Sequence, residues 1–282
     1  MATLADRLPG FPRWVVEQYW IETGRSLATA PAHPLALRRA YRTARALLPQ
    51  VAHLTGTPSA TLDRYLRELR RGGLRREIGV RCPKATGIGS PHAEILYLFV
   101  RASRPSVVVE TGVHLGVSSA HILQALADNV HGELWSVDLP TVGSGYRVNE
   151  DGRIDRAHLA SIGETGSAVP ERLRSRWHLT LGDAKELLPT LPAPPVWDLF
   201  FHDSDHSRAH MLWEFGVAWS RLRDGGLLLS DDVPDNDAFL SFAREVGATP
   251  FLWLRRGTIR RGPSRPDAPD AGPPASPPAG RA

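Results

Sequence analysis

The 282-residue chain is 42% hydrophobic and 23% charged, which is typical of a soluble globular protein with one large domain or two modest ones. Its formal charge is +4, but no aromatic residues interleave with a basic run, so we expect no nucleic-acid partner. The single cysteine, Cys82, excludes an intramolecular disulfide, and no stretch reaches the ~18 apolar residues of a spanning helix, so we expect a cytoplasmic protein without a membrane partner.

Residues 11–78 are expected to be helical, because apolar residues recur at helical spacing in several stretches. Pro34, Pro49 and the Gly-Thr-Pro sequence at 56–58 separate these stretches. The arginines between the apolar positions fall on polar helix faces, where solvation is a simpler interpretation than anion binding. Residues 1–84 therefore predict an N-terminal helical cap, which is compatible with a homo-oligomer formed through this surface.

From about residue 90 the pattern alternates between helix and strand, which is typical of a parallel sheet covered on both faces. Helices are expected at 91–100, 118–127 and 238–246, a turn at Gly225 and Gly226, and strands at 106–109, 134–137, 178–181, 197–201, 227–229, 250–254 and 258–260. The fold class is therefore α/β, with a Rossmann-like, doubly wound, mainly parallel seven-stranded sheet over residues 85–261. Residues 262–282 contain seven prolines and predict a disordered tail.

Residues 139–170 form a long connection directly after the second strand. A connection of this length in a compact domain is usually a lid or a binding loop. An insertion with a short helix is an equally good interpretation.

The first strand runs into a glycine turn that reads Glu-Thr-Gly-Val-His-Leu-Gly-Val-Ser-Ser from Glu110. Its two glycines lie four residues apart, which is not the spacing of a dinucleotide-binding turn. We expect Gly112 to let the backbone approach a ligand and Gly116 to relieve packing at the start of the next helix. The hydroxyl groups of Ser118 and Ser119, with free helix N–H groups, could hold a carboxylate, and Glu110 suits an ammonium group.

Two further acids follow the next strands at the same edge. Asp138 lies 28 residues after Glu110 and is placed to accept hydrogen bonds from ribose hydroxyl groups. Asp183, in a Gly-Asp-Ala turn after the third strand, could address an adenine edge. Each acid alone could simply cap a helix, but the three in this order indicate a nucleoside with an amino acid attached.

The fourth and fifth strands also end in acids, Asp203 in the first case and Asp231 with Asp232 in the second. A right-handed crossover would bring these carboxylates to one sheet edge, where they predict a divalent metal site. Alternatively, Asp203 and Asp205 cap the following helix, and the aspartate pair is solvated. A zinc site formed by nearby histidines is a weaker alternative, since it leaves the glycine turn unexplained. Those histidines are His202, His206 and His210.

Residues 85–260 resemble class I S-adenosylmethionine-dependent methyltransferases. The Ser-Pro-His-Ala-Glu sequence from Ser90, the Glu-Thr-Gly turn and the three aspartates look like the cation-dependent O-methyltransferases. A histidine three residues after Asp203 is similar to the branch that methylates macrolide sugars and other natural products, where it acts as a base. Catechol-type enzymes have Asp-Asn at the second acidic position and a lysine near the first, so this chain departs from them and the substrate class stays open.

The resemblance implies S-adenosylmethionine as methyl donor and a hydroxylated small molecule as acceptor, with His206 as general base and Asp203 beside it. Cofactor contacts are then implied at Glu110, Gly112, Gly116, Ser118, Asp138 and Asp183, and Mg²⁺ contacts at Asp203, Asp231 and Asp232. Two alternatives remain: a metal-independent methyltransferase of small molecules, and a non-catalytic scaffold that binds the cofactor.

Overall fold

The computed structural model describes residues 44–83, 85, 90–139, 164–191, 194 and 196–263, and the backbone of 147–148 and 154–155. The helices expected before residue 44 and residues 264–282 of the expected tail lie outside the described residues. Within the described part, none of the helices has the length and apolar character needed to cross a membrane.

A seven-stranded sheet forms the centre of the fold, in the order β5-β2-β1-β6-β7-β9-β8. Its strands are β1 (Val107–Thr111), β2 (Glu133–Asp138), β5 (Trp177–Leu181), β6 (Trp197–His202), β7 (Leu222–Ser230), β8 (Phe251–Trp253) and β9 (Arg256–Arg260). Strands β5, β2, β1, β6 and β7 are parallel, whereas β9 runs antiparallel to both β7 and β8. The predicted Rossmann-like, mainly parallel sheet is confirmed.

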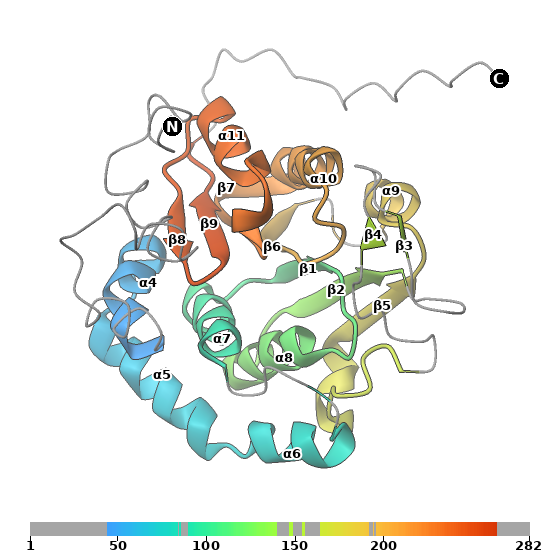
Figure 1. The fold of residues 1–282 in the computed structure, drawn as a ribbon. Helices are drawn as coiled ribbons and strands as arrows, with labels where there is room; N and C mark the ends of the chain where they lie inside the picture. The colour runs from blue at the N-terminus through green and yellow to red at the C-terminus, as the bar shows by residue number, and fades with distance from the viewer. Residues whose placement is uncertain are drawn as a thin grey trace, which may run out of the picture.

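Helices cover both faces of this sheet (Figure 1). One face carries α7 (Pro91–Ser103) and α8 (Val117–Asn129), with α4 (Leu48–Thr55), α5 (Ser59–Arg71) and α6 (Leu74–Arg81) as an outer arc. The other face carries α9 (Ala184–Leu187), α10 (Arg208–Arg221) and α11 (Ala238–Glu245). Short 3₁₀ helices are η1 (Ala44–Leu47), η2 (Glu171–Arg176), η3 (Leu188–Thr190) and η4 (Val233–Asp235), and β3 (Arg147–Val148) pairs with β4 (Ile154–Asp155).

The central strands β1 and β6 are largely buried on both sides, so successive side chains enter two different cores. Val108 and Phe201 join the core under α7 and α8, whereas Val109 and Phe200 join the core under α10 and α11. The buried leucines of α5 belong to the first of these cores. The described part of the predicted helical cap is thus packed directly onto the sheet domain.

The strand ends lie level at the carboxyl edge of the sheet. Thr111 pairs with His202, and His202 pairs with Ser230. The ladder then continues, because the N–H of Asp203 donates to Thr111 (2.8 Å) and the N–H of Asp231 donates to His202 (2.9 Å). The sequence prediction that these two acids meet at one edge is confirmed.

One local expectation was wrong. The Gly225-Gly226 pair, expected as a turn before the fifth strand, lies inside β7, which begins at Leu222. The pairing of β6 with β7 shifts register between Trp197 and Leu199, and Gly225 adopts a φ of 78°. The strand therefore passes through an irregular segment where the sequence pattern indicates a break.

Candidate active site

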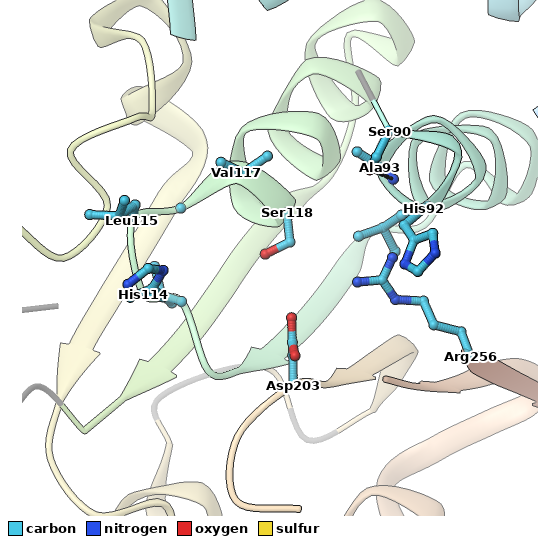
Figure 2. A pocket seen from close by; sticks show the side chains of 12 residues that line it. Ser90, His92, Ala93, His114, Leu115, Val117, Ser118, Asp203 and Arg256 are labelled. Carbon is cyan, nitrogen blue, oxygen red and sulfur yellow. Dashed lines mark hydrogen bonds between the residues drawn. The ribbon is translucent and has the colours of Figure 1, made fainter. Parts of the chain in front are cut away.

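A cavity of about 430 Å³ opens at the carboxyl edge of the sheet. This volume falls in the usual range for small-molecule sites. Figure 2 shows Ser118 and Asp203 extending toward each other across it, with His92 and Arg256 on one wall. It is lined by Ser90, His92, Ala93, Leu96, Val113, His114, Leu115, Gly116, Val117, Ser118, Asp203 and Arg256.

The glycine turn after β1 is held by contacts with its own chain. Gly112 has a φ of 81°, and a Cβ atom at this position would lie 1.9 Å from the carbonyl oxygen of Asp203. Gly116 has a φ of 84°, and its Cβ would lie 2.9 Å from both Gly166 and Val169. The close approach expected at Gly112 is therefore made by the backbone that carries Asp203.

Glu110 is fully buried beneath this turn and faces three hydroxyl groups. It accepts hydrogen bonds from Ser118 (2.8 Å), Ser119 (2.6 Å) and Ser136 (2.9 Å). Its carboxylate thus joins β1, β2 and the start of α8. The hydroxyl groups of Ser118 and Ser119, which were expected to hold a ligand carboxylate, donate their hydrogens to Glu110 instead. Among the described residues no side chain caps the N-terminus of α8, so its first N–H groups are the part of the turn that suits an anion.

Burial raises the pKa of Glu110 to about 7 from an ordinary 4.5, against the lowering effect of the serines. The folded protein then holds this proton more tightly, so its stability falls as pH rises from about 4.5 to about 7. We expect wild type to lose about 2–3 kcal/mol more than Glu110→Gln between pH 5 and pH 8, measured by urea unfolding. Glu245→Gln, at an exposed position, serves as the control. Equal pH dependence of wild type and Glu110→Gln would contradict this assignment.

Asp138 and Asp183 both make the local bonds typical of turn and helix-capping residues. Asp138 accepts from the N–H groups of Val113 (2.9 Å) and His114 (3.5 Å), and burial raises its pKa. Asp183 caps α9 by accepting from the N–H of Lys185 at 2.8 Å. Neither acid lines the cavity, and their contacts with ribose and adenine stay predictions.

The three aspartates predicted to hold a metal lie next to two arginines. Asp231 Oδ2 is 2.7 Å from Arg256 Nη2, and Asp232 Oδ1 is 2.8 Å from Arg255 Nε. Burial and the neighbouring Asp231 carboxylate raise the pKa of Asp203. Asp231 is partly buried, yet Arg256 lowers its pKa to about 2.

These pairs bear directly on the expected magnesium ion. Within the described residues, no group of three or more His, Cys, Asp or Glu side chains is arranged to hold a metal ion. Magnesium requires several open oxygen atoms in octahedral geometry. Since guanidinium groups take up two of the three carboxylates, the residues as arranged do not fit it.

His206 lies behind Asp203 and is absent from the lining of the cavity. Its Nε2 is 3.9 Å from Asp203 Oδ1, and its ring meets that of His202 edge to face at 5.3 Å. Asn236 Nδ2 donates to the His206 carbonyl oxygen at 2.8 Å, which fixes the backbone there. The histidines that do line the cavity are His92 and His114, and the pKa of His92 is lowered to about 4 by burial and by Arg256.

A buried carboxylate that sequence reasoning missed supports this part of the site. Glu214 of α10 is fully buried and accepts four hydrogen bonds. Its donors are Thr111 Oγ1 (2.6 Å), His202 Nδ1 (2.6 Å), Ser204 Oγ (2.8 Å) and His210 Nε2 (2.9 Å). Two of the histidines weighed as zinc ligands are thus bound to Glu214. The sequence does contain a signal for this residue, because Glu214 is the one acid in the otherwise apolar stretch from Met211 to Trp219.

Part of the chain is similar to a known protein family. A family model described as "Methyltransferase domain" matches residues 109–233. This segment spans the glycine turn and all the acidic strand ends. A search of curated proteins found no match.

Several solved structures are similar to the chain. One is a methyltransferase from Podospora anserina bound to S-adenosylhomocysteine, at 14% identity and a TM-score of 0.47, covering 67% of this chain and 87% of that chain. Another is the O-methyltransferase TomG from Streptomyces achromogenes, involved in tomaymycin synthesis. Its identity is 18% and its TM-score 0.46, and the match covers 67% of this chain and 90% of that chain. A third is an O-methyltransferase from Bacillus cereus. Its identity is 16% and its TM-score 0.46, and the match covers 67% of this chain and 91% of that chain. Residues 109–233 are therefore similar to a methyltransferase domain, and this matched segment contains the glycine turn and the strands β2, β5, β6 and β7.

Proposed function

We propose that the chain is an S-adenosylmethionine-dependent O-methyltransferase that acts on a hydroxyl group of a small molecule. The observation that carries this proposal is the cavity between the N-terminus of α8 and Asp203 (Figure 2). One side offers N–H groups for the carboxylate of the donor, and the other offers a carboxylate for an acceptor hydroxyl. The order β5-β2-β1-β6 also fits, since it leads from Asp183 through Asp138 to the turn and then to Asp203.

When bound, S-adenosylmethionine supplies a methyl group on a positively charged sulfur. In the proposed transfer, the acceptor oxygen forms a bond to this carbon, the carbon–sulfur bond breaks, and the hydroxyl proton leaves the acceptor. Asp203 lines the cavity and would accept a hydrogen bond from the hydroxyl. His206, whose Nε2 is 3.9 Å from Asp203 Oδ1, is the proposed general base that takes up this proton.

Isothermal titration calorimetry with S-adenosylmethionine tests the cofactor part of the proposal. We expect wild type to bind and Asp138→Asn to bind about 10-fold more weakly, because an amide is a poorer acceptor for ribose hydroxyl groups than a carboxylate. Glu245→Gln, at an exposed position, should bind as wild type does. Absence of binding by folded wild type would end the proposal.

The acceptor part needs a screen of hydroxylated small molecules with release of S-adenosylhomocysteine as readout. Loss of turnover in Asp203→Asn and His206→Gln, with cofactor binding retained, would support their proposed roles. Tight cofactor binding without turnover over a broad panel would instead favour the scaffold alternative. Magnesium dependence is a separate prediction of the sequence, and it requires turnover to stop after dialysis against EDTA and to return with Mg²⁺.

A further inference from the structure

We propose that Arg256 supplies the positive charge required by the carboxylates at the sheet edge, so that this protein binds no divalent cation there. The inference rests on the proposed function only for the identity of the cavity. Arg256 is 8% exposed and is the first residue of β9. It enters the cavity wall beside His92, opposite the turn that carries His114 (Figure 2).

Three contacts hold the Arg256 guanidinium group where it is. Its Nη2 is 2.7 Å from Asp231 Oδ2. Its Cζ lies 5.5 Å from the centroid of the Phe201 ring and 5.6 Å from that of Trp253. A buried guanidinium with a carboxylate and two aromatic rings around it is well suited to remain in place.

A divalent cation and this guanidinium group compete for the same carboxylate. Asp231 Oδ2 faces Arg256 and Asp231 Oδ1 accepts from the N–H of Asp232, so an ion shared by Asp203 and Asp231 would have to compete for one of these two oxygens. The arginine would then remain beside the ion, buried and without its partner, and two positive charges at short range repel strongly in a poorly solvated site. Arg256 therefore opposes cation binding by its charge and by its contact with one of the carboxylate oxygens that a cation would bind.

The neighbouring Arg255 provides a matched comparison. It pairs with Asp232 and with Asp235, but its side chain is 45% exposed. Exposed ion pairs of this kind are weak and are easily released to solvent. Loss of Arg255 should leave the Asp231–Arg256 pair intact. Of the two arginines, only loss of Arg256 should therefore allow a cation to bind Asp203 and Asp231.

The test is calorimetric titration with Mn²⁺ of the full chain and its variants, without an acceptor. We expect wild type and Arg255→Ala to show no saturable binding up to about 1 mM Mn²⁺. Arg256→Ala and the longer Arg256→Gln should each gain one site, and adding Asp203→Asn should remove it. One equivalent of Mn²⁺ bound by wild type would overturn the proposal. So would the absence of a gained site in both folded Arg256 variants.

Parallel titration with S-adenosylmethionine keeps the two ideas separate. Failure of wild type to bind the cofactor would remove the proposed function and leave the Mn²⁺ result unaffected. Binding of the cofactor together with one Mn²⁺ would keep the proposed function and remove the role of Arg256.

Discussion

Gly112→Ala is expected to lower the free energy of unfolding by about 3–5 kcal/mol and to abolish binding of S-adenosylmethionine. Two costs combine at this position. The backbone φ of 81° is strained for alanine, and the new Cβ would lie 1.9 Å from the carbonyl oxygen of Asp203. Because the obstacle is backbone, the turn and the segment carrying Asp203 have to separate. Urea unfolding and calorimetry measure the two effects.

Two other glycines separate these costs. Gly247 has a φ of 68°, and a Cβ at this position would have no heavy atom within 4 Å, so Gly247→Ala tests the backbone strain alone. Gly216 lies in α10 with equally open surroundings and no positive φ, and its replacement by alanine should be neutral or slightly stabilising. If Gly112→Ala costs no more than Gly247→Ala, the close approach of Asp203 is not what requires glycine.

Glu214→Ala should cost about 3–5 kcal/mol of stability, because it leaves three buried donors and the partly buried Ser204 without their common acceptor. Glu214→Gln should cost less, since the amide still accepts from some of them. The partners of Glu214 come from the ends of β1 and β6, the following loop and α10. Loss of Glu214 should therefore also disturb the candidate active site. Urea unfolding measures the loss of stability, and calorimetry should show weaker cofactor binding.

The dependence of the Glu214 effect on pH has a definite sign. Burial by itself would raise the pKa of Glu214, but His202 and His210 outweigh it and lower the pKa in the folded state. The contribution of Glu214 is then fully present above about pH 4.5 and is lost as pH falls below that value. The difference between wild type and Glu214→Gln should shrink on acidification. Glu245→Ala, on the exposed end of α11, should change stability by less than about 0.5 kcal/mol at any pH.

The strands and helices of the sheet domain could be predicted because their signals are local. A β-branched or apolar run with an acid at or just after its end marks the ends of β1, β2, β5, β6 and β7 within a few residues. The short apolar run at Leu227 was also found, but the start of its strand was missed. Its first residues pair with β6 through a shifted register that no local pattern encodes.

The roles of the site residues depended on partners far away in the chain. Glu110 and Asp138 were recognised as strand-end acids, yet one is bound to three serines and the other to the glycine turn. Arg256 lies in an edge hairpin without a motif, 25 residues from Asp231. Glu214 is 103 residues from Thr111. No pattern along the chain indicates such pairs.

By itself, the sequence determined the α/β class, the strand ends, the glycine turn and the meeting of Asp203 with Asp231 at one edge. These follow from side-chain period, turn chemistry and the handedness of crossovers, which act over short segments. Only the tertiary structure decided which charges face each other there, and it placed Arg256 against Asp231 and His206 behind Asp203. The energy of a buried charge depends on every group packed around it, and those groups are brought together by folding.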